Sequence, residues 1–297
     1  MSLWNFNIGS WRPIYAAGLC YLRNSPVDIF KEYIRHGVVG NTPRFVQFRN
    51  KDDIIFDLDV HECVQKAIFC FHYFEPEDVA VFRTFIKPNS IVLDVGANIG
   101  QYALLASKLM GETGQVYAFE PSPEVYPKLQ HHVQLNEFSN IEVITCAVAA
   151  KSGSMEFYPA NEQGNQGVGS LIPADDYRAQ IRSTASIDVD VVSLDAFCES
   201  RDITHVDMLK IDVEGFDLEV LKGAEALMKN NPNLVIMSEV EPINLAQLGA
   251  TAADFYGFMK ERGFHAWYAE RNGKLKRLKG ESPPYHPNVF FLHESKG

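Results

Sequence analysis

The residues best suited to chemistry in this chain are carboxylates that follow short apolar runs. Glu120 comes directly after the run 115–119, and Asp212 and Glu214 come at the end of another apolar stretch. A carboxylate can accept two hydrogen bonds from a ribose diol, or it can take a proton from an attacking hydroxyl. Ligands of open α/β sheets lie outside the carboxyl ends of the strands. We therefore expect these acids to mark a ligand site.

A glycine-containing turn precedes these carboxylates. The stretch 90–100 reads SIVLDVGANIG, and its apolar residues predict a strand buried on both faces, with Asp94 near the end. The residues of the turn that follows are Gly96, Asn98 and Gly100. Residues 101–110 predict a helix, whose first N–H groups could meet a carboxylate or a phosphate. We therefore expect a nucleotide-like ligand above this turn.

The spacing within the turn distinguishes between ligands. Glu120 lies near the distance of ~20 residues at which this architecture places a ribose-binding acid. The order Gly-x-Gly-x-x-Gly, which a pyrophosphate requires, is missing because Asn98 stands where the second glycine would be. The pattern therefore favours a nucleoside with a short polar tail over a dinucleotide. A turn of this kind can also serve the fold alone.

The hydrophobic periodicity predicts alternating strands and helices around this site. Strands are expected at 91–95, 115–119, 141–148, 205–213 and 234–240. Two more strands, at 264–269 and 289–292, should pair antiparallel through a hairpin at Gly273. The predicted fold class is α/β, with a Rossmann-like, mostly parallel sheet of seven strands whose last strand is antiparallel.

Two regions lie outside this alternation. Residues 1–73 are rich in aromatic side chains and predict an α+β extension with a hairpin over 44–60. This extension could shape the substrate site, form a homodimer contact or serve as a scaffold. Residues 159–187 show little periodicity, and we interpret them as a loop insertion that covers the acceptor site. The main domain would then run over 74–297.

Composition and charge narrow the class of protein. The 297 residues are 46% apolar and 22% charged, which is typical of a soluble globular protein. A net charge of −11 argues against a nucleic acid partner. The five cysteines form no Cys-x-x-Cys pair, which favours a reducing, cytoplasmic location over zinc or disulfides. The apolar run 14–22 is too short to span a membrane.

Three motifs together resemble the FkbM family of S-adenosylmethionine (SAM)-dependent methyltransferases. They are VLDVGANIG at 92–100, AFEPSP at 118–123 and LKIDVEG at 209–215. The similarity runs from about Phe74 to the C-terminus. The resemblance implies the class I methyltransferase sheet, SAM as the methyl donor and S-adenosylhomocysteine (SAH) as its product. It also implies methyl transfer to a hydroxyl oxygen of a sugar, a glycan or a small metabolite.

The residue pattern and the resemblance together give two sets of candidate site residues. The predicted cofactor-binding residues are Glu75, Asp94, Gly96, Asn98, Gly100, Glu120, Pro121, Ala147 and Asp212. The predicted catalytic residues are Asp212 first, then Glu214 and Glu239. Asp212 could instead support the SAM amino group, and Glu75 could simply cap a helix. The acids could also share a divalent cation, although the spacing gives no specific support for a metal.

Two other functions stay open at this point. An NAD(P)-dependent oxidoreductase is compatible with Asp94, Glu120 and the glycine turn, although the missing pyrophosphate order argues against it. A non-catalytic Rossmann-like binding module would keep the pocket without the reaction. We also expect His131 and His132 to face solvent on a helix over 123–136, away from any chemistry.

Overall fold

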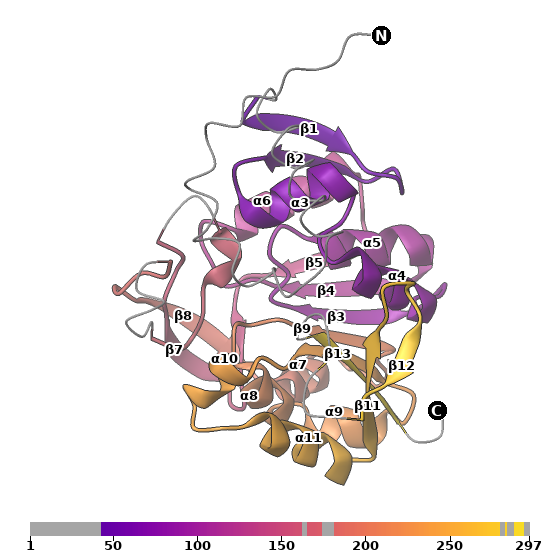
Figure 1. Ribbon diagram of the computed structural model, residues 1–297, viewed down its shortest axis with the longest axis vertical. Helices are drawn as coiled ribbons and strands as arrows, with labels where there is room; N and C mark the ends of the chain where they lie inside the picture. Colours follow the sequence, from indigo (N-terminus) through magenta and orange to yellow (C-terminus); the bar gives the residue numbers. More distant parts are fainter. Residues whose placement is uncertain (1–42, 162–164, 174–180, 280–282, 284–287, 294–297) are drawn as a thin grey trace.

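The computed structural model describes residues 43–161, 165–173, 181–279, 283 and 288–293 (Figure 1). An eight-stranded sheet of order β12-β11-β13-β10-β9-β3-β4-β5 forms its centre. Its strands are β3 (Ile91–Val95), β4 (Gln115–Phe119), β5 (Ile141–Ile144), β9 (Met208–Ile211), β10 (Val235–Glu239), β11 (Phe264–Ala269), β12 (Leu275–Arg277) and β13 (Asn288–His293).

The direction of the strands confirms the predicted Rossmann-like sheet. Strands β3, β4, β5, β9 and β10 are parallel, and β13 is antiparallel to β10 and β11. β12 adds a short eighth strand at the edge, so the hairpin at Gly273 joins β11 to β12 rather than to β13. After β3, the chain first adds β4 and β5 on one side of β3 and then β9 and β10 on the other side. The strand order therefore reverses between β3 and β9, and ligands of such sheets bind at the carboxyl ends of the strands at this switch point.

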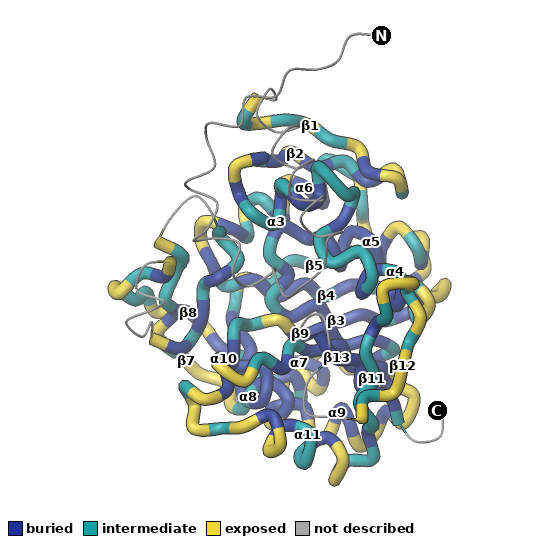
Figure 2. Tube along the Cα trace, in the orientation of Figure 1, coloured by how far each residue is buried: buried dark blue, intermediate teal, exposed yellow. Residues whose placement is uncertain are grey.

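Helices cover both faces of the sheet. α4 (Pro76–Phe85), α5 (Gln101–Met110) and α6 (Tyr126–Leu135) contribute to one core with Val92, and α7 (Leu194–Ser200), α8 (Asp217–Lys222), α9 (Glu225–Asn230) and α11 (Ala252–Glu261) to another with Leu93. Neighbouring residues of β3 enter opposite cores because side chains alternate along a strand. Figure 2 shows β3 and β4 as buried between these layers. The short elements η2 (Gly111–Thr113) and α10 (Pro242–Ala246) lie in connections.

One predicted helix is divided in two. The sequence pattern predicts a continuous helix over 216–229, whereas the structure has α8 and α9 with Gly223 and Ala224 between them. The chain at Gly223 passes so close to Ala149 that a Cβ atom would lie 2.3 Å from the Ala149 carbonyl oxygen. Packing against a neighbouring segment therefore determines this break.

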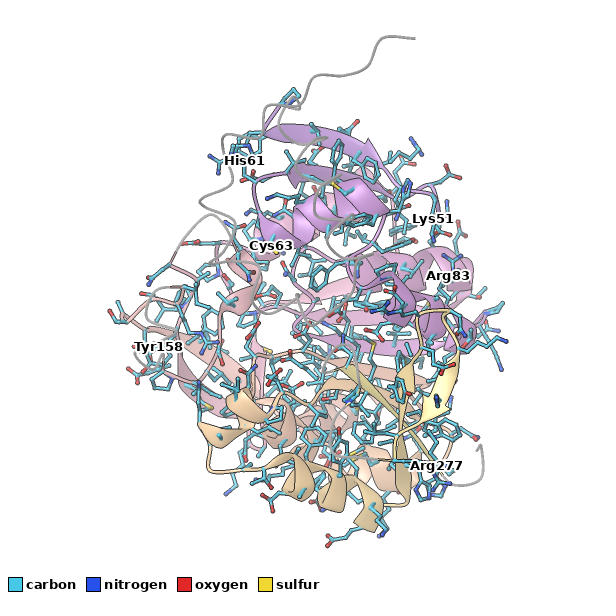
Figure 3. The ribbon with its side chains drawn as sticks, viewed as in Figure 1. Lys51, His61, Cys63, Arg83, Tyr158 and Arg277 are labelled. Carbon is cyan, nitrogen blue, oxygen red and sulfur yellow. The ribbon has the colours of Figure 1, made fainter. Side chains whose placement is uncertain are left out.

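The described part of the N-terminal extension is a hairpin followed by a helix. β1 (Phe45–Arg49) and β2 (Ile55–Asp59) confirm the predicted hairpin, and α3 (Cys63–Phe71) follows. Arg83 of α4 forms an ion pair of 2.7 Å with Asp52 in the hairpin turn, and Figure 3 shows Arg83 and Lys51 on the same side of the molecule. Residues 1–42 lie outside the described part. The domain boundary at residue 73 stays a prediction.

The prediction that His132 faces solvent is wrong. His132 is buried, and its Nε2 accepts a hydrogen bond of 3.1 Å from the backbone N–H of Asp57, so its Nδ1 can donate to Ile99 O at 2.9 Å. His131 does face solvent, as expected. The difference arises because β2 docks on α6, and this contact between distant segments has no local sequence signal.

The insertion lies between two strands of a second, smaller sheet. β6 (Ala147–Val148), β7 (Gly153–Phe157) and β8 (Ile187–Val192) pair in the order β6-β8-β7. The predicted third strand, 141–148, is therefore split between two sheets. Between β7 and β8, the described residues include the short 3₁₀ helix η3 (Gln166–Val168). Among the described helices, none has the length and apolar character needed to cross a membrane.

Candidate functional site

The loop that follows β3 is packed tightly against its neighbours. Gly96 and Gly100 have φ of 74° and 97°, a region that favours glycine. A Cβ on Gly96 would lie 1.9 Å from the backbone oxygen of Asp212, which follows β9. The N–H groups of Gly96 and Ala97 donate to Phe119 O at 3.0 and 2.9 Å. The ends of β3, β4 and β9 therefore meet at one edge of the sheet.

Glu120 is held in place by backbone hydrogen bonds. Its Oε2 accepts from Asn98 N and its Oε1 from Ser122 N, both at 2.9 Å, and the residue is 7% exposed. Burial raises the pKa of Glu120 to about 7, although the two N–H donors oppose this rise. A carboxylate oxygen can accept more than one hydrogen bond. Glu120 is therefore a fixed acceptor at the end of β4.

Lys210 links two of the acids at this edge. Its Nζ lies 2.9 Å from Gly96 O, 3.5 Å from Asp94 Oδ1 and 3.4 Å from Asp212 Oδ2. Burial lowers the pKa of Lys210, but the carboxylates of Asp212 and Asp94 outweigh this, and the pKa is raised. The sequence interpretation did not count Lys210 among the candidate site residues. The available signal was a lysine inside an otherwise apolar strand.

Two acids that follow β9 are more exposed than Glu120, whereas Asp217 is buried. The side chain of Asp212 is 44% exposed and that of Glu214 is 26% exposed. Burial and the nearby charges of Glu214 and Asp212 raise the pKa of Glu239 well above its usual value. Burial likewise raises the pKa of Asp217 to about 7, and Ser238 Oγ donates to its Oδ1 at 3.0 Å. These acids form one electrostatic cluster.

Glu75 belongs to the same cluster, and the capping alternative for it is wrong. It is the N-cap residue directly before α4, yet its side chain makes no capping hydrogen bond. Instead, Asn288 Nδ2 donates to Glu75 Oε2 at 2.6 Å. Gln101 at the start of α5 exchanges hydrogen bonds of 2.6 and 3.0 Å with the backbone of Phe74, which fixes the position of Glu75 beside the glycine turn.

The family follows from a comparison with known proteins. Residues 94–266, more than half of the chain, match the model of the Methyltransferase FkbM domain. The chain belongs to the FkbM methyltransferase family. It is therefore an enzyme that acts as a methyltransferase, which excludes the oxidoreductase and the non-catalytic module as its main function.

Relatives of this FkbM-family enzyme include other methyltransferases. Methyltransferase sdnD of Sordaria araneosa is 26% identical over 63% of this chain and 78% of its own. Hexuronic acid methyltransferase AglP of Haloferax volcanii is 28% identical over 54% and 62%, respectively. The 31-O-demethyl-FK506 methyltransferase FkbM of Streptomyces tacrolimicus is 32% identical over 47% and 61%.

The fold brings most of the predicted site residues to the ends of four strands, whereas Ala147 lies in another strand that follows the end of β5. Asp94, Gly96, Asn98, Gly100, Glu120, Pro121, Asp212, Glu214, Glu239 and Glu75 all lie at or beside the ends of β3, β4, β9 and β10. Ala147 instead lies in β6, where it is buried in a separate small core and pairs with Val191. Its assignment as a cofactor contact stays a prediction.

Several partner predictions are not decided by this geometry. Within the described ranges, no three His, Cys, Asp or Glu side chains gather in a way that could hold a metal ion. Cys146 and Cys198, two of the cysteines that the structure describes, are free thiols. The cytoplasmic location and the homodimer stay predictions.

Proposed function

We propose that this methyltransferase moves a methyl group from SAM to a hydroxyl oxygen of a sugar or a small metabolite. The observation that carries the proposal is the geometry of Glu120, whose two oxygens are each aligned by a backbone N–H at 2.9 Å. A carboxylate fixed in this way at the end of β4, the second strand of the Rossmann-like sheet, can accept both hydroxyls of a ribose. Asn98 N donates to Glu120 Oε2, so the loop after β3 lies directly beside this carboxylate, where the rest of the nucleoside would be held.

The charge of the site supports a cationic ligand. Asp94 and Asp212 both lie within 3.5 Å of Lys210 Nζ, so two carboxyl groups surround one lysine at this edge. SAM carries a positive sulfonium and an ammonium group, and such a site attracts both. A pyrophosphate would be repelled by the same charges. Electrostatics and the glycine spacing therefore agree in favouring SAM over NAD(P).

The residues of the chain can prepare both reactants. When bound, SAM supplies an activated methyl group on a sulfonium sulfur. Glu120 would orient the ribose, while Lys210 holds Asp94 and Asp212 on either side of itself. Much of the rate in such a displacement comes from holding the reacting atoms in line at close range. The rigid loop after β3 provides this kind of positioning.

Asp212 is the best placed residue to take the proton of the acceptor hydroxyl. Its carboxylate is partly exposed and lies beside the glycine turn, whereas Asp94 is fully buried. The raised pKa of Glu239 favours its protonated form, which can donate a hydrogen bond to the acceptor. Glu214 lies near Glu239, as Asp212 does. A base positioned in this way typically contributes about 10²- to 10⁴-fold to a rate.

The relatives support an oxygen acceptor. The name of one relative specifies an O-demethylated substrate, and the name of another specifies a hexuronic acid. The first name places the methyl group on an oxygen, and the second names a sugar acid as the acceptor. We extend this class, rather than either compound, to the present enzyme.

A ligand comparison followed by a turnover assay tests the proposal. Thermal shifts of the full chain should be positive with SAH and absent with NAD and NADP, because only ligands that bind the native state stabilise it. SAH release from SAM should then appear with at least one member of a panel of methyl glycosides and hydroxylated metabolites. Stabilisation by NAD instead of SAH would contradict the proposed function.

A further inference from the structure

Arg182 is an arginine whose side chain is entirely buried. It lies near the C-terminal end of the insertion and is 0% exposed. Its Nε donates to Val168 O at 2.7 Å and its Nη1 to Ile172 O at 3.0 Å. Its Nη2 lies 3.9 Å from Glu214 Oε2, a carboxylate of the candidate site. A buried charge is costly unless it is paired and hydrogen-bonded, so this position is strongly specified.

Arg182 holds a short segment, residues 165–172, which we name the bridge segment. Ser170 of this segment is buried, and its Oγ lies 3.5 Å from Val213 O and 3.4 Å from Glu214 O. The backbone of Ser170 also exchanges hydrogen bonds of 2.8 and 3.1 Å with Tyr158 at the end of β7. One end of the bridge segment is therefore fixed to the turn that carries Glu214.

The other end of the bridge segment lies against the glycine turn. A Cβ atom on Gly167 would be 2.8 Å from Asn98 Nδ2. Lys128 of α6 donates a hydrogen bond to the side chain of Gln166. The bridge segment thus touches Asn98, which follows β3, and Glu214, which follows β9. It therefore contacts one residue proposed for the cofactor site and one proposed for the acceptor site.

We propose that the bridge segment forms a wall shared by the cofactor pocket and the methyl-acceptor pocket, and that Arg182 is the positioning residue that holds it. This inference rests on the proposed function and assigns the insertion a part in it. Because Gly167 contacts Asn98, a substitution at Gly167 should change the affinity of the cofactor pocket for SAH. Because the bridge segment and Arg182 contact the turn that carries Glu214, a substitution at Arg182 should change the KM for the acceptor.

The first experiment uses the close contact at Gly167. Gly167→Ala adds one methyl group, and the side-chain amide of Asn98 must move to accommodate it. This amide is the end of a flexible side chain, so it can move without unfolding the chain. SAH titrated by calorimetry should bind about fivefold more weakly, or worse, which is about 1 kcal/mol. Gly257→Ala is the matched control, because a Cβ there meets nothing within 4 Å.

The outcomes of this titration are distinct. A wild-type protein that fails to bind SAH would overturn the proposed function and the wall together. A wild type that binds SAH, with Gly167→Ala and Gly257→Ala both unchanged, would overturn the wall alone.

The second experiment separates acceptor binding from folding. With the fastest acceptor among methyl glucoside, methyl glucuronoside and a hydroxylated macrolide, Arg182→Met should raise the acceptor KM about tenfold and leave the KM for SAM within about twofold. Arg182→Lys, which keeps a cation near Glu214, should be intermediate. The matched control is Arg201→Met, which breaks an exposed pair with Glu142. A loss of kcat at an unchanged acceptor KM would contradict the positioning role.

Amide hydrogen exchange tests the positioning role of Arg182 without the need for an acceptor. In Arg182→Met, the amides of residues 165–172 and 213–216 should exchange faster together, while those of β3 keep their wild-type rates. In Arg201→Met, both sets should exchange as in the wild type. Unchanged exchange in these two segments of Arg182→Met would overturn the proposal even if none of the three acceptors is methylated.

Discussion

The ends of β3 and β4 and the ends of β9 and β10 are both acidic, but they hold their carboxylates differently. Glu120 is nearly buried, and each of its oxygens is bound to a backbone N–H. Asp212 is 44% exposed, and its closest cation is Lys210 Nζ at 3.4 Å. The first end is fixed before any ligand arrives, whereas the second leaves a carboxylate that an incoming acceptor can reach.

This difference separates binding from chemistry within one edge of the sheet. A fixed carboxylate suits a cofactor that must be held in a single orientation, since no side-chain freedom is lost on binding. An exposed carboxylate suits proton transfer, since it must meet a hydroxyl that enters from solvent. The two ends are joined through Gly96, which packs on the backbone of Asp212.

The largest expected effect is from a change at the junction of the two ends. Gly96→Ala should lower the free energy of unfolding by about 4 kcal/mol or prevent folding, because its Cβ would lie 1.9 Å from Asp212 O. Gly249→Ala is the matched control, with φ of 70° but nothing within 4 Å of a Cβ, and should cost only about 1 kcal/mol. Denaturant unfolding measures both. Equal losses in the two variants would show that the junction is not tight.

A smaller effect should separate the roles of the two ends. Asp212→Asn should lower kcat by about 10²- to 10⁴-fold through loss of the base, while the Kd of SAH changes less than about threefold. Asp190→Asn, at an exposed position of β8, is the control. If the SAH affinity of Asp212→Asn falls in proportion to kcat, Asp212 instead supports the SAM amino group.

The smallest expected effect is a dependence of SAH binding on pH. The pKa of Glu120 is raised to about 7, and only the ionised carboxylate can accept both ribose hydroxyls. Binding therefore favours the ionised form, and the affinity for SAH should fall about tenfold between pH 8 and pH 6. Glu120→Gln should bind weakly with a flatter pH profile. An affinity that rises on acidification would contradict this assignment.

The sequence predicted the parts of the fold and site that depend on local pattern. The apolar runs, the glycine turn and the acid at position 120 indicated the sheet and its ligand edge, because strand burial and turn chemistry are encoded by neighbouring residues. The hairpin over β1 and β2 and the start of α4 at Pro76 were likewise found at their predicted places. The family resemblance was confirmed independently by the domain match.

The missed features depend on contacts between distant residues. Lys210 of β9 lies opposite Asp94 on the adjacent strand β3, Arg182 approaches Glu214, and His132 is buried because β2 packs on it. Each side chain would ordinarily face solvent, and only the assembled fold provides its buried partner. The side chain of Glu75 bonds to Asn288, more than 200 residues away, which is why local capping was a wrong alternative.

The most direct test of the account is a calorimetric titration of SAH into the wild type, Glu120→Ala and Glu124→Ala. Loss of two hydrogen bonds to a charged acceptor should weaken SAH binding by about 100-fold, or about 3 kcal/mol, in Glu120→Ala. Glu124 is exposed close by and serves as the matched control, with wild-type affinity expected. Equal SAH affinity in Glu120→Ala and the wild type would contradict the claim that this carboxylate holds the ribose of SAM.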